Sequence, residues 1–227
     1  NLFADTVVSG PDLMKARGPY AAFQLSDGIQ KVLAATICEE TGKQLYNDGT
    51  GTDFDGFLIA NDDGVLYPTY ATVPRSSVPG MAGYVDGAGA TLTIPYIVDA
   101  LGRVNQGASH VDLITTTQAL WDSVQNRAQT QQVFYSGNEQ NNVAKLGFDS
   151  VKVLSADLVY EAQCPSGNVF GHTTENLELA VMPDRMWSFQ GIEKVPGSDA
   201  YELTTLLMGN LINLAPRQSL RLYSVTA

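Results

Sequence analysis

Residues 21–46, AAFQLSDGIQKVLAATICEETGKQLY, run directly into residues 47–57, NDGTGTDFDGF. In the first stretch apolar residues recur at multiples of four positions, which is the spacing of a helix with one buried side. They are Leu25, Ile29, Leu33, Ile37 and Leu45, with Val32 and Cys38 beside them. Because steps of four advance about 40° around the axis, the stripe winds, and we expect the helix to contact several surfaces.

The two ends of this predicted rod carry different signals. Its start falls either at Pro19, a residue suited to the first turn, or after Ser26, a residue suited to a cap. Its end is marked by Asp48 and Gly49, which stop helices. The glycine-rich turns that follow lack the Gly-Lys-Ser/Thr of a P-loop, and the chain contains no Gly-x-Ser-x-Gly elbow.

Composition narrows the classes of function. The chain has 227 residues, 44% of them hydrophobic, which is enough for one large or two modest domains. Its 13 Lys and Arg against 24 Asp and Glu give a formal charge of −11, which opposes general attraction to nucleic acid or anionic membranes. No stretch is apolar and long enough to cross a bilayer, so we expect no membrane partner. The first residue is Asn1, so we expect a processed product or part of something longer.

The region after the rod predicts a helix–strand–helix unit. Residues 91–104 and 117–127 have helical spacing, with Thr93 as a cap, and residues 111–116 form a buried-strand candidate. Residues 56–60 form a short strand candidate, and residues 67–90, rich in proline, glycine and tyrosine, form a long loop of the kind that is functional or interfacial. Residues 129–142 are amide-rich and predict a surface loop.

From Leu146 onward the pattern is that of strands. Alternation is clearest in residues 176–181, residues 201–214 are a further long apolar segment, and residues 220–225 are a further strand candidate. Helices first and strands later, without regular βαβ repetition, predict an α+β fold.

Side chains that often carry chemistry do not form a recognised constellation. His110 and His172 are the only histidines and lack ligand partners at metal-site spacing. The turn after the predicted helix carries acidic and hydroxyl residues that superficially suggest a calcium loop, Asp48, Thr50, Thr52, Asp53 and Asp55. The glycine and the distal glutamate that a calcium loop requires do not occur at the right positions, so we expect a solvated turn.

The remaining candidates have structural interpretations. The acidic neighbours Glu39–Glu40 and Asp62–Asp63 predict solvated faces, and Trp121 and Trp187 predict core anchors. Cys38 and Cys164 show no metal or redox spacing, which favours a reducing compartment. We expect Cys38 to be buried, and we assign no catalytic, cofactor-binding or metal-binding residue.

Several landmarks occur in the order found in one known family. The chain resembles the major capsid proteins of tailed bacteriophages, which have the Hong Kong 97 type fold. The residues that carry the resemblance are Leu45-Tyr46-Asn47-Asp48-Gly49-Thr50-Gly51, Phe54-Asp55-Gly56-Phe57-Leu58, Val73-Pro74-Arg75-Ser76 with Pro79, Val111-Asp112-Leu113-Ile114-Thr115-Thr116, Lys145-Leu146-Gly147-Phe148, and Gly209-Asn210-Leu211 with Pro216-Arg217.

The resemblance implies a domain arrangement. Residues 1–20 would be the end of an extended hairpin (E-loop) and the entry to the spine helix. Residues 21–56, with the spine helix, and residues 172–209, with long antiparallel strands, would form a peripheral domain. Residues 57–171 would form an axial α/β domain, to which residues 210–227 return.

The resemblance also implies a function. The expected protein is not an enzyme and uses no cofactor. Copies of it would form hexameric and pentameric capsomers of an icosahedral shell around double-stranded DNA, in the virion and assembled in the host cytoplasm, with scaffold, portal and decoration proteins as further partners. Two alternatives stay open: an encapsulin-like bacterial compartment, and an α+β hydrolase or binding domain with its site under residues 67–90.

Overall fold

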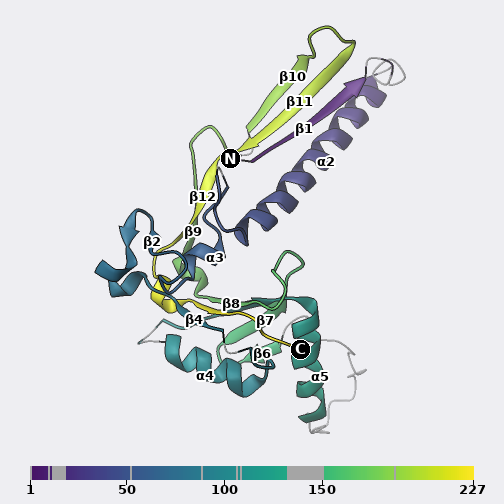
Figure 1. Ribbon diagram of the computed structural model, residues 1–227. Coiled ribbons are helices and arrows are strands. Elements are labelled where there is room, and N and C mark those ends of the chain that lie inside the picture. The colour runs from purple at the N-terminus through teal and green to yellow at the C-terminus, as the bar shows by residue number, and fades with distance from the viewer. Residues whose placement is uncertain are drawn as a thin grey trace. The chain divides into compact units, whose positions relative to one another are not determined.

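The computed structural model describes residues 2–9, 11, 19–51, 53–87, 89–105, 107, 109–131, 151–186 and 188–227 (Figure 1). The chain divides into two compact units. Unit 1 comprises Asn1–Gly56 and Leu179–Ile212, and unit 2 comprises Phe57–Glu178 and Asn213–Ala227. Helices and strands occur in both, which confirms the α+β prediction.

In unit 1 the predicted rod is a single helix, α2 (Pro19–Leu45). It begins at the proline and not after Ser26. The last turn is closed by the amides of Tyr46 and Asn47, which donate to carbonyl oxygens of the helix, and the chain then turns at Gly49 with φ of 69°. The stop signal read from the sequence is therefore confirmed.

Helix α2 packs on a three-stranded antiparallel sheet of order β1-β11-β10 (Figure 1). The strands are β1 (Leu2–Ser9), β11 (Ala200–Leu207) and β10 (Ser188–Lys194). Alternate residues of β1 face the helix, and Leu2, Ala4 and Val8 among them are buried together with Leu33 and Ile37 of α2 and with Phe54. This cluster is the core of unit 1.

The apolar stripe of α2 is narrower than its sequence suggests. Leu33 and Ile37 are buried, but Val32 is 64% exposed and Cys38 is exposed. The expectation that Cys38 is buried is therefore wrong. Each of these two residues lies about 100° around the helix from its buried neighbour in sequence, which turns it away from the sheet.

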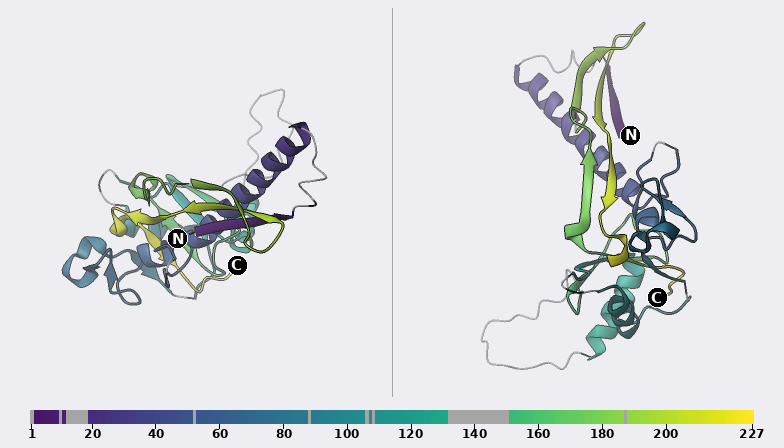
Figure 2. Two further views of the ribbon diagram at one scale, coloured as in Figure 1. Left: turned by 90° about the horizontal axis from the view of Figure 1, so that it is seen from above. Right: turned by 90° about the vertical axis from the view of Figure 1, so that its left-hand side faces the viewer.

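Strands β9 (Leu177–Val181) and β12 (Gly209–Asn213) pair in a two-stranded sheet and lie side by side in the views of Figures 1 and 2. The apolar segment of residues 201–214 is divided between β11 and β12, because the chain breaks at Met208, whose amide donates to the carbonyl oxygen of Arg185. The alternation read in residues 176–181 is present, but its apolar face is not buried, since Leu179 is 41% exposed.

Unit 2 is built on a mixed six-stranded sheet of order β4-β13-β8-β5-β7-β6. The strands are β4 (Tyr84–Asp86), β5 (Leu113–Thr116), β6 (Val151–Val153), β7 (Ala156–Tyr160), β8 (Val169–His172) and β13 (Leu220–Leu222). The pairs β4–β13 and β5–β7 are parallel, and the other three are antiparallel.

Helices α4 (Ile94–Val104) and α5 (Gln118–Gln131) share one hydrophobic core with this sheet, so the predicted helix–strand–helix unit is confirmed. The hydroxyl of Thr93 accepts a hydrogen bond from the Tyr96 amide at 3.3 Å, which is the predicted cap. Trp121 is buried, as expected, and donates through Nε1 to the Leu158 carbonyl oxygen at 3.3 Å.

Two expectations for unit 2 are corrected, and one strand was not foreseen. Residues 57–60 form a helical turn, α3 (Phe57–Ala60), and not a strand, and the Asn61 amide closes it on the Phe57 carbonyl oxygen. Residues 67–90 are not a plain loop, because they contain β2 (Thr69–Tyr70), β3 (Val73–Pro74), two 3-10 turns (Arg75–Ser77 and Pro79–Met81) and β4. The sequence pattern also missed β8, whose four residues are all buried and therefore do not alternate.

Some expectations lie outside the described residues. Residues 132–150, which include most of the predicted surface loop and Lys145-Leu146-Gly147-Phe148, are among them, as are Thr52 and Trp187. Among the described helices, none has the length and apolar character needed to cross a membrane.

Candidate functional site

Residues 67–90, which the sequence indicated as a functional or interfacial segment, contribute to a buried polar cluster in unit 2. Its charged members are Asp62, which is fully buried, and Arg75, which is 3% exposed. Asp62 Oδ2 accepts hydrogen bonds from the amides of Gly64 and Tyr67, both at 2.9 Å. The expectation that Asp62 is solvated is therefore wrong, because its buried carboxylate stabilises the turn by accepting hydrogen bonds from the backbone.

Arg75 supplies most of the donors of this cluster. Its Nε donates to the Tyr67 carbonyl oxygen at 3.1 Å, its Nη2 to that of Ile59 at 2.5 Å, and its Nη1 to that of Met81. The guanidinium carbon lies 5.0 Å from the centre of the Tyr70 ring. Burial lowers the pKa of Arg75, while the nearby Asp62 carboxylate raises it.

A neutral histidine extends the cluster into the sheet. His172, at the end of β8, is 1% exposed, and its ring centre lies 4.0 Å from that of Phe57. Asn61 Nδ2 lies 3.3 Å from His172 Nδ1, which assigns the ring proton to Nε2. Burial lowers the pKa of His172 to about 3, although Asp112 acts in the opposite direction. The ring is therefore uncharged at neutral pH.

Asn61 also ties the end of β12 to this cluster. Its Oδ1 accepts from Asn213 Nδ2 at 3.4 Å, and the Asn213 amide donates to the Tyr70 hydroxyl at 2.8 Å. Two buried polar atoms of this cluster have no hydrogen-bond partner among the described residues, Asp62 Oδ1 and His172 Nε2. The groups of the cluster otherwise bind one another and the backbone, an arrangement that holds residues 57–83 in a fixed shape.

The two histidines lie closer in the fold than in the sequence. Thr173 Oγ1 donates to the His110 carbonyl oxygen at 3.1 Å, because His110 precedes β5 and His172 ends the neighbouring β8. His110 is exposed and His172 is buried. Within the described part of the chain, no three His, Cys, Asp or Glu side chains gather as a metal site would require.

The acidic turn after α2 has a structural use in unit 1. Asp53 Oδ2 accepts from Asn47 Nδ2 at 2.7 Å, and Asp55 Oδ2 accepts from Asn210 Nδ2 at 2.8 Å. The two carboxylates are half-buried and bonded to amides, which corrects the simple solvated turn. Gly56 follows because a Cβ there would lie 2.5 Å from the Asn47 carbonyl oxygen.

The remaining residues considered from the sequence as possible carriers of chemistry are the cysteines and the acidic pair of α2. Burial, with Glu161 nearby, raises the pKa of the Cys164 thiol to about 12, so this thiol is not a nucleophile at neutral pH. Glu39 and Glu40 both form ion pairs with Lys43, at 3.1 and 2.6 Å. Both ion pairs lie on the solvated side of the helix, as the sequence predicted for Glu39 and Glu40.

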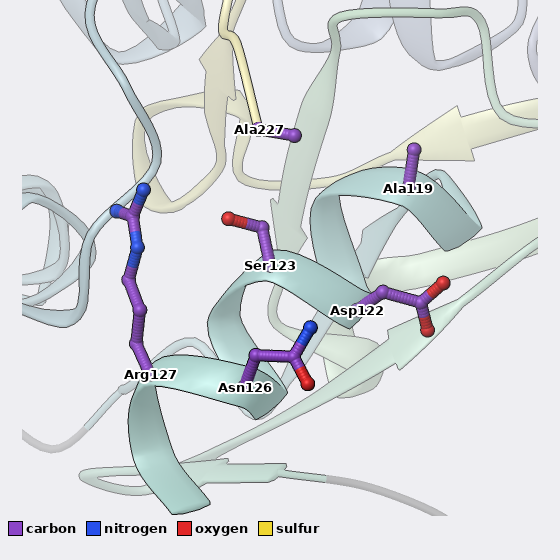
Figure 3. Close-up of a pocket in the computed structure, with 6 residues that line it drawn as sticks. All are labelled: Ala119, Asp122, Ser123, Asn126, Arg127 and Ala227. Atoms are coloured by element: carbon purple, nitrogen blue, oxygen red, sulfur yellow. The ribbon is translucent and has the colours of Figure 1, made fainter. Parts of the chain in front are cut away.

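A shallow hollow of about 510 Å³ lies on the outer side of α5 (Figure 3). It is lined by Ala119, Asp122, Ser123, Asn126, Arg127 and Ala227. Arg127 Nη1 donates to the Leu92 carbonyl oxygen at 2.7 Å, so the guanidinium is held to the backbone. The Ser123 hydroxyl has a carboxylate and an amide for neighbours in this lining but no histidine that could serve as its base.

Sequence reasoning missed Asn61, Arg75 and Asn213 as members of the cluster. A signal was present for the first, since Asn61-Asp62-Asp63-Gly64 is a run of residues whose side chains bond to nearby backbone. For Arg75 the signal was weak, because an arginine in a proline-rich segment is usually exposed.

Comparison with solved structures identifies the fold. The chain matches a chain of the capsid asymmetric unit of cyanophage A-1(L), with a TM-score of 0.65 and 14% identity, over 99% of this chain and 77% of the other. It matches the SrpI encapsulin of Synechococcus elongatus with a TM-score of 0.61 and 13% identity, over 99% and 74%. It also matches the procapsid of satellite phage P4 with a TM-score of 0.57 and 14% identity, over 100% and 74%.

These likenesses show that the chain has the Hong Kong 97 type fold of capsid shell proteins, as the sequence resemblance predicted. No family model matches the sequence, and no curated protein sequence matches it.

Proposed function

We propose that this chain is the major capsid protein of a tailed phage. Copies of it assemble into an icosahedral shell around double-stranded DNA, and no residue of the chain catalyses a reaction. The observation that carries the proposal is the likeness to the cyanophage A-1(L) capsid chain, which extends over 99% of this chain. The polar cluster supports a structural role, because its side chains brace residues 57–83.

Charge supports the same role. A formal charge of −11 is unfavourable for a protein that grips nucleic acid. It suits a container, since a lining that does not bind DNA tightly allows the genome to be packed and released. The chain encloses DNA without reading its sequence and is located in the virion, after assembly in the host cytoplasm.

The two units correspond, in this proposal, to the two domains of such a subunit. Residues 21–56 and 172–209 form the peripheral domain, with α2 as the spine helix, and residues 57–171 and 210–227 form the axial domain. Residues 1–20 form the end of the extended hairpin. The division of the chain after Gly56 and the long α2 support this assignment.

The partners of the protein are copies of itself in hexameric and pentameric capsomers, together with scaffold, portal and decoration proteins. The likeness to a phage G structure of major capsid and decoration proteins supports the last of these. Shell subunits meet through large repeated interfaces, so function is distributed over surfaces and not concentrated in a pocket.

An encapsulin-like compartment is the second candidate, because the SrpI encapsulin matches with a TM-score between those of the cyanophage A-1(L) and satellite phage P4 chains. Expression of the protein from its complete coding sequence, followed by sedimentation and cryo-electron microscopy, tests both candidates. We expect closed icosahedral particles that, purified from their natural source, protect double-stranded DNA from nuclease. Particles filled with cargo protein would select the compartment, and strictly monomeric protein under all assembly conditions would contradict both.

A further inference from the structure

One stretch of unit 2 presents an exposed surface without charge. Residues 64–85, which we call the uncharged segment, contain twelve exposed positions, and none of them carries a charged side chain. Arg75 is the one charged residue of the segment, and it is buried. The two longest runs that lack any charged residue, 203–216 and 162–174, have only one and three exposed positions. A soluble surface commonly carries charge at about a quarter to a third of its positions, so the segment is unusual.

The uncharged segment is held in shape by its own charged residue. Arg75 donates to the carbonyl oxygens of Tyr67, Ile59 and Met81, and its guanidinium carbon lies 5.0 Å from the centre of the Tyr70 ring. Three prolines restrict the backbone of the segment further. The surface is therefore ordered before any partner arrives, which lowers the entropic cost of docking.

The turn between β2 and β3, inside the segment, has an unfavourable backbone. The two strands pair through Tyr70 and Val73, so Ala71 and Thr72 form a two-residue turn. Both residues have left-handed φ angles, 49° and 66°. Such turns favour asparagine and glycine, and a β-branched residue is rare there. Strained backbone of this kind clusters at functional sites, and both residues are exposed.

The absence of charge limits what can cover the uncharged segment. Nucleic acid is bound through lysine and arginine side chains, and the segment exposes none. A second copy of the chain is acidic, with a formal charge of −11, so two copies repel each other except where charges are sparse. The cores of protein interfaces are likewise depleted of charged residues. The segment therefore fits a further copy of this chain.

The same argument selects the surface that the segment meets. Against an acidic surface of the next copy, the segment would remove carboxylates from water and offer them no exposed cation, which is unfavourable. Against the same segment of the next copy it buries no further charge. We propose that the uncharged segments of neighbouring copies meet one another around a symmetry axis of the assembly, with Ala71 and Thr72 in the contact. The inference rests on the proposed function, because it takes further copies of the chain as the neighbours.

Photo-crosslinking of the assembled protein maps the contact. A benzophenone amino acid replaces Thr72, the assembled protein is irradiated, and mass spectrometry locates the adducts. We expect adducts that join position 72 of one copy to residues 64–85 of another. The matched control carries the same amino acid in place of Asn126, which is exposed on α5, and should give no adduct to residues 64–85.

Substitutions that differ only in charge test the electrostatic argument. Thr72→Asp should reduce the yield of assembled particles at least about tenfold, because it places like charges opposite each other. Thr72→Asn should leave the yield unchanged, since Asn and Asp have the same shape and both tolerate a left-handed backbone. Asn126→Asp adds the same charge outside the segment and should assemble normally. Raised salt should restore part of the loss in Thr72→Asp, and circular dichroism shows that each variant is folded.

Mixed assembly tests whether like segments meet. Thr72→Asp copies and Thr72→Lys copies should each assemble poorly alone. Their mixture should form particles, because opposite charges then face each other across the axis. A mixture that assembles no better than either variant alone would contradict the pairing of like segments.

The outcomes separate this inference from the proposed function. Normal particles in Thr72→Asp, with adducts from position 72 to other residues or to another protein, would overturn the inference and leave the capsid role intact. Adducts between uncharged segments in a protein that never forms closed particles would support the contact and overturn the capsid role. Absence of both adducts and particles would overturn both.

Discussion

Unit 1 and unit 2 bury their chains in different ways. In unit 1 one helix covers one face of a three-stranded sheet, and Phe3 and Val7 on β1 remain 68% and 58% exposed. In unit 2 the central strand β8 is buried on both faces, by the helical core on one side and by Phe57 and the polar cluster on the other.

The difference has a thermodynamic meaning. A sheet covered on one face buries less apolar surface per residue, so unit 1 gains less from folding alone. Its uncovered face is suited to contacts with other molecules, whereas the central strand β8 of unit 2 is buried on both faces.

Arg75→Met should have the largest effect. It removes three hydrogen bonds to carbonyl oxygens and the positive charge near the Asp62 carboxylate, which together cost about 4 kcal/mol of the free energy of unfolding. Urea unfolding followed by circular dichroism measures this loss. The control Arg103→Met removes an arginine whose ion pair with Asp99 is exposed, and its effect should stay below about 1 kcal/mol. Equal losses in the two variants would contradict a bracing role for Arg75.

Leu158→Ala and Ile37→Ala compare the two cores. Each removes a side chain that is at most 1% exposed and should cost about 3 kcal/mol. Hydrogen exchange followed by mass spectrometry should show the loss of protection of Ile37→Ala mainly within residues 19–51 and 188–207, and that of Leu158→Ala mainly within unit 2. If both variants lose protection across the whole chain, the units do not unfold separately.

His172 should make unit 2 sensitive to acid. Its pKa is lowered to about 3 in the folded protein, whereas the unfolded chain takes up the proton near 6.5. The unfolded state therefore binds more protons between these values, and stability falls as the pH falls, by about 2 kcal/mol between pH 7 and pH 5. Denaturant titrations of His172→Gln should lose this slope. His110→Gln, at an exposed site, is the control and should keep it.

Thr93→Ala should have the smallest measurable effect. It removes the hydroxyl that accepts from the Tyr96 amide at the start of α4, which costs about 1 kcal/mol. Thr36→Ala is the matched control on α2, because its hydroxyl only bonds back to the Val32 carbonyl oxygen and should change stability by less than about 0.5 kcal/mol. A melting temperature that falls more in the control would contradict the cap.

Sequence reasoning succeeded where one local signal decided the structure. The four-residue spacing of Leu33 and Ile37, the proline at position 19 and the cap at Thr93 each act within a few residues, and α2 and α4 follow them. The same reasoning placed β5 and α5, whose apolar patterns are equally local.

It failed where distant segments decide the environment. Residues 169–172 show no alternation because both faces of β8 are covered by parts of the chain far away in sequence. Asp62 was predicted to be solvated because its burial depends on a turn that its own side chain stabilises. Cys38 read as buried because the sequence does not show the width of the sheet that α2 faces.

The position of β13 has a consequence for how the protein is made. This strand, Leu220–Leu222, lies between β4 and β8 inside the six-stranded sheet, although it follows all the other described strands in the chain. Until it emerges from the ribosome, β4 and β8 cannot be joined, and the sheet of unit 2 stays open. A chain that terminates early therefore lacks an internal strand and not a dispensable tail, so prematurely ended products are kept from folding into competent subunits.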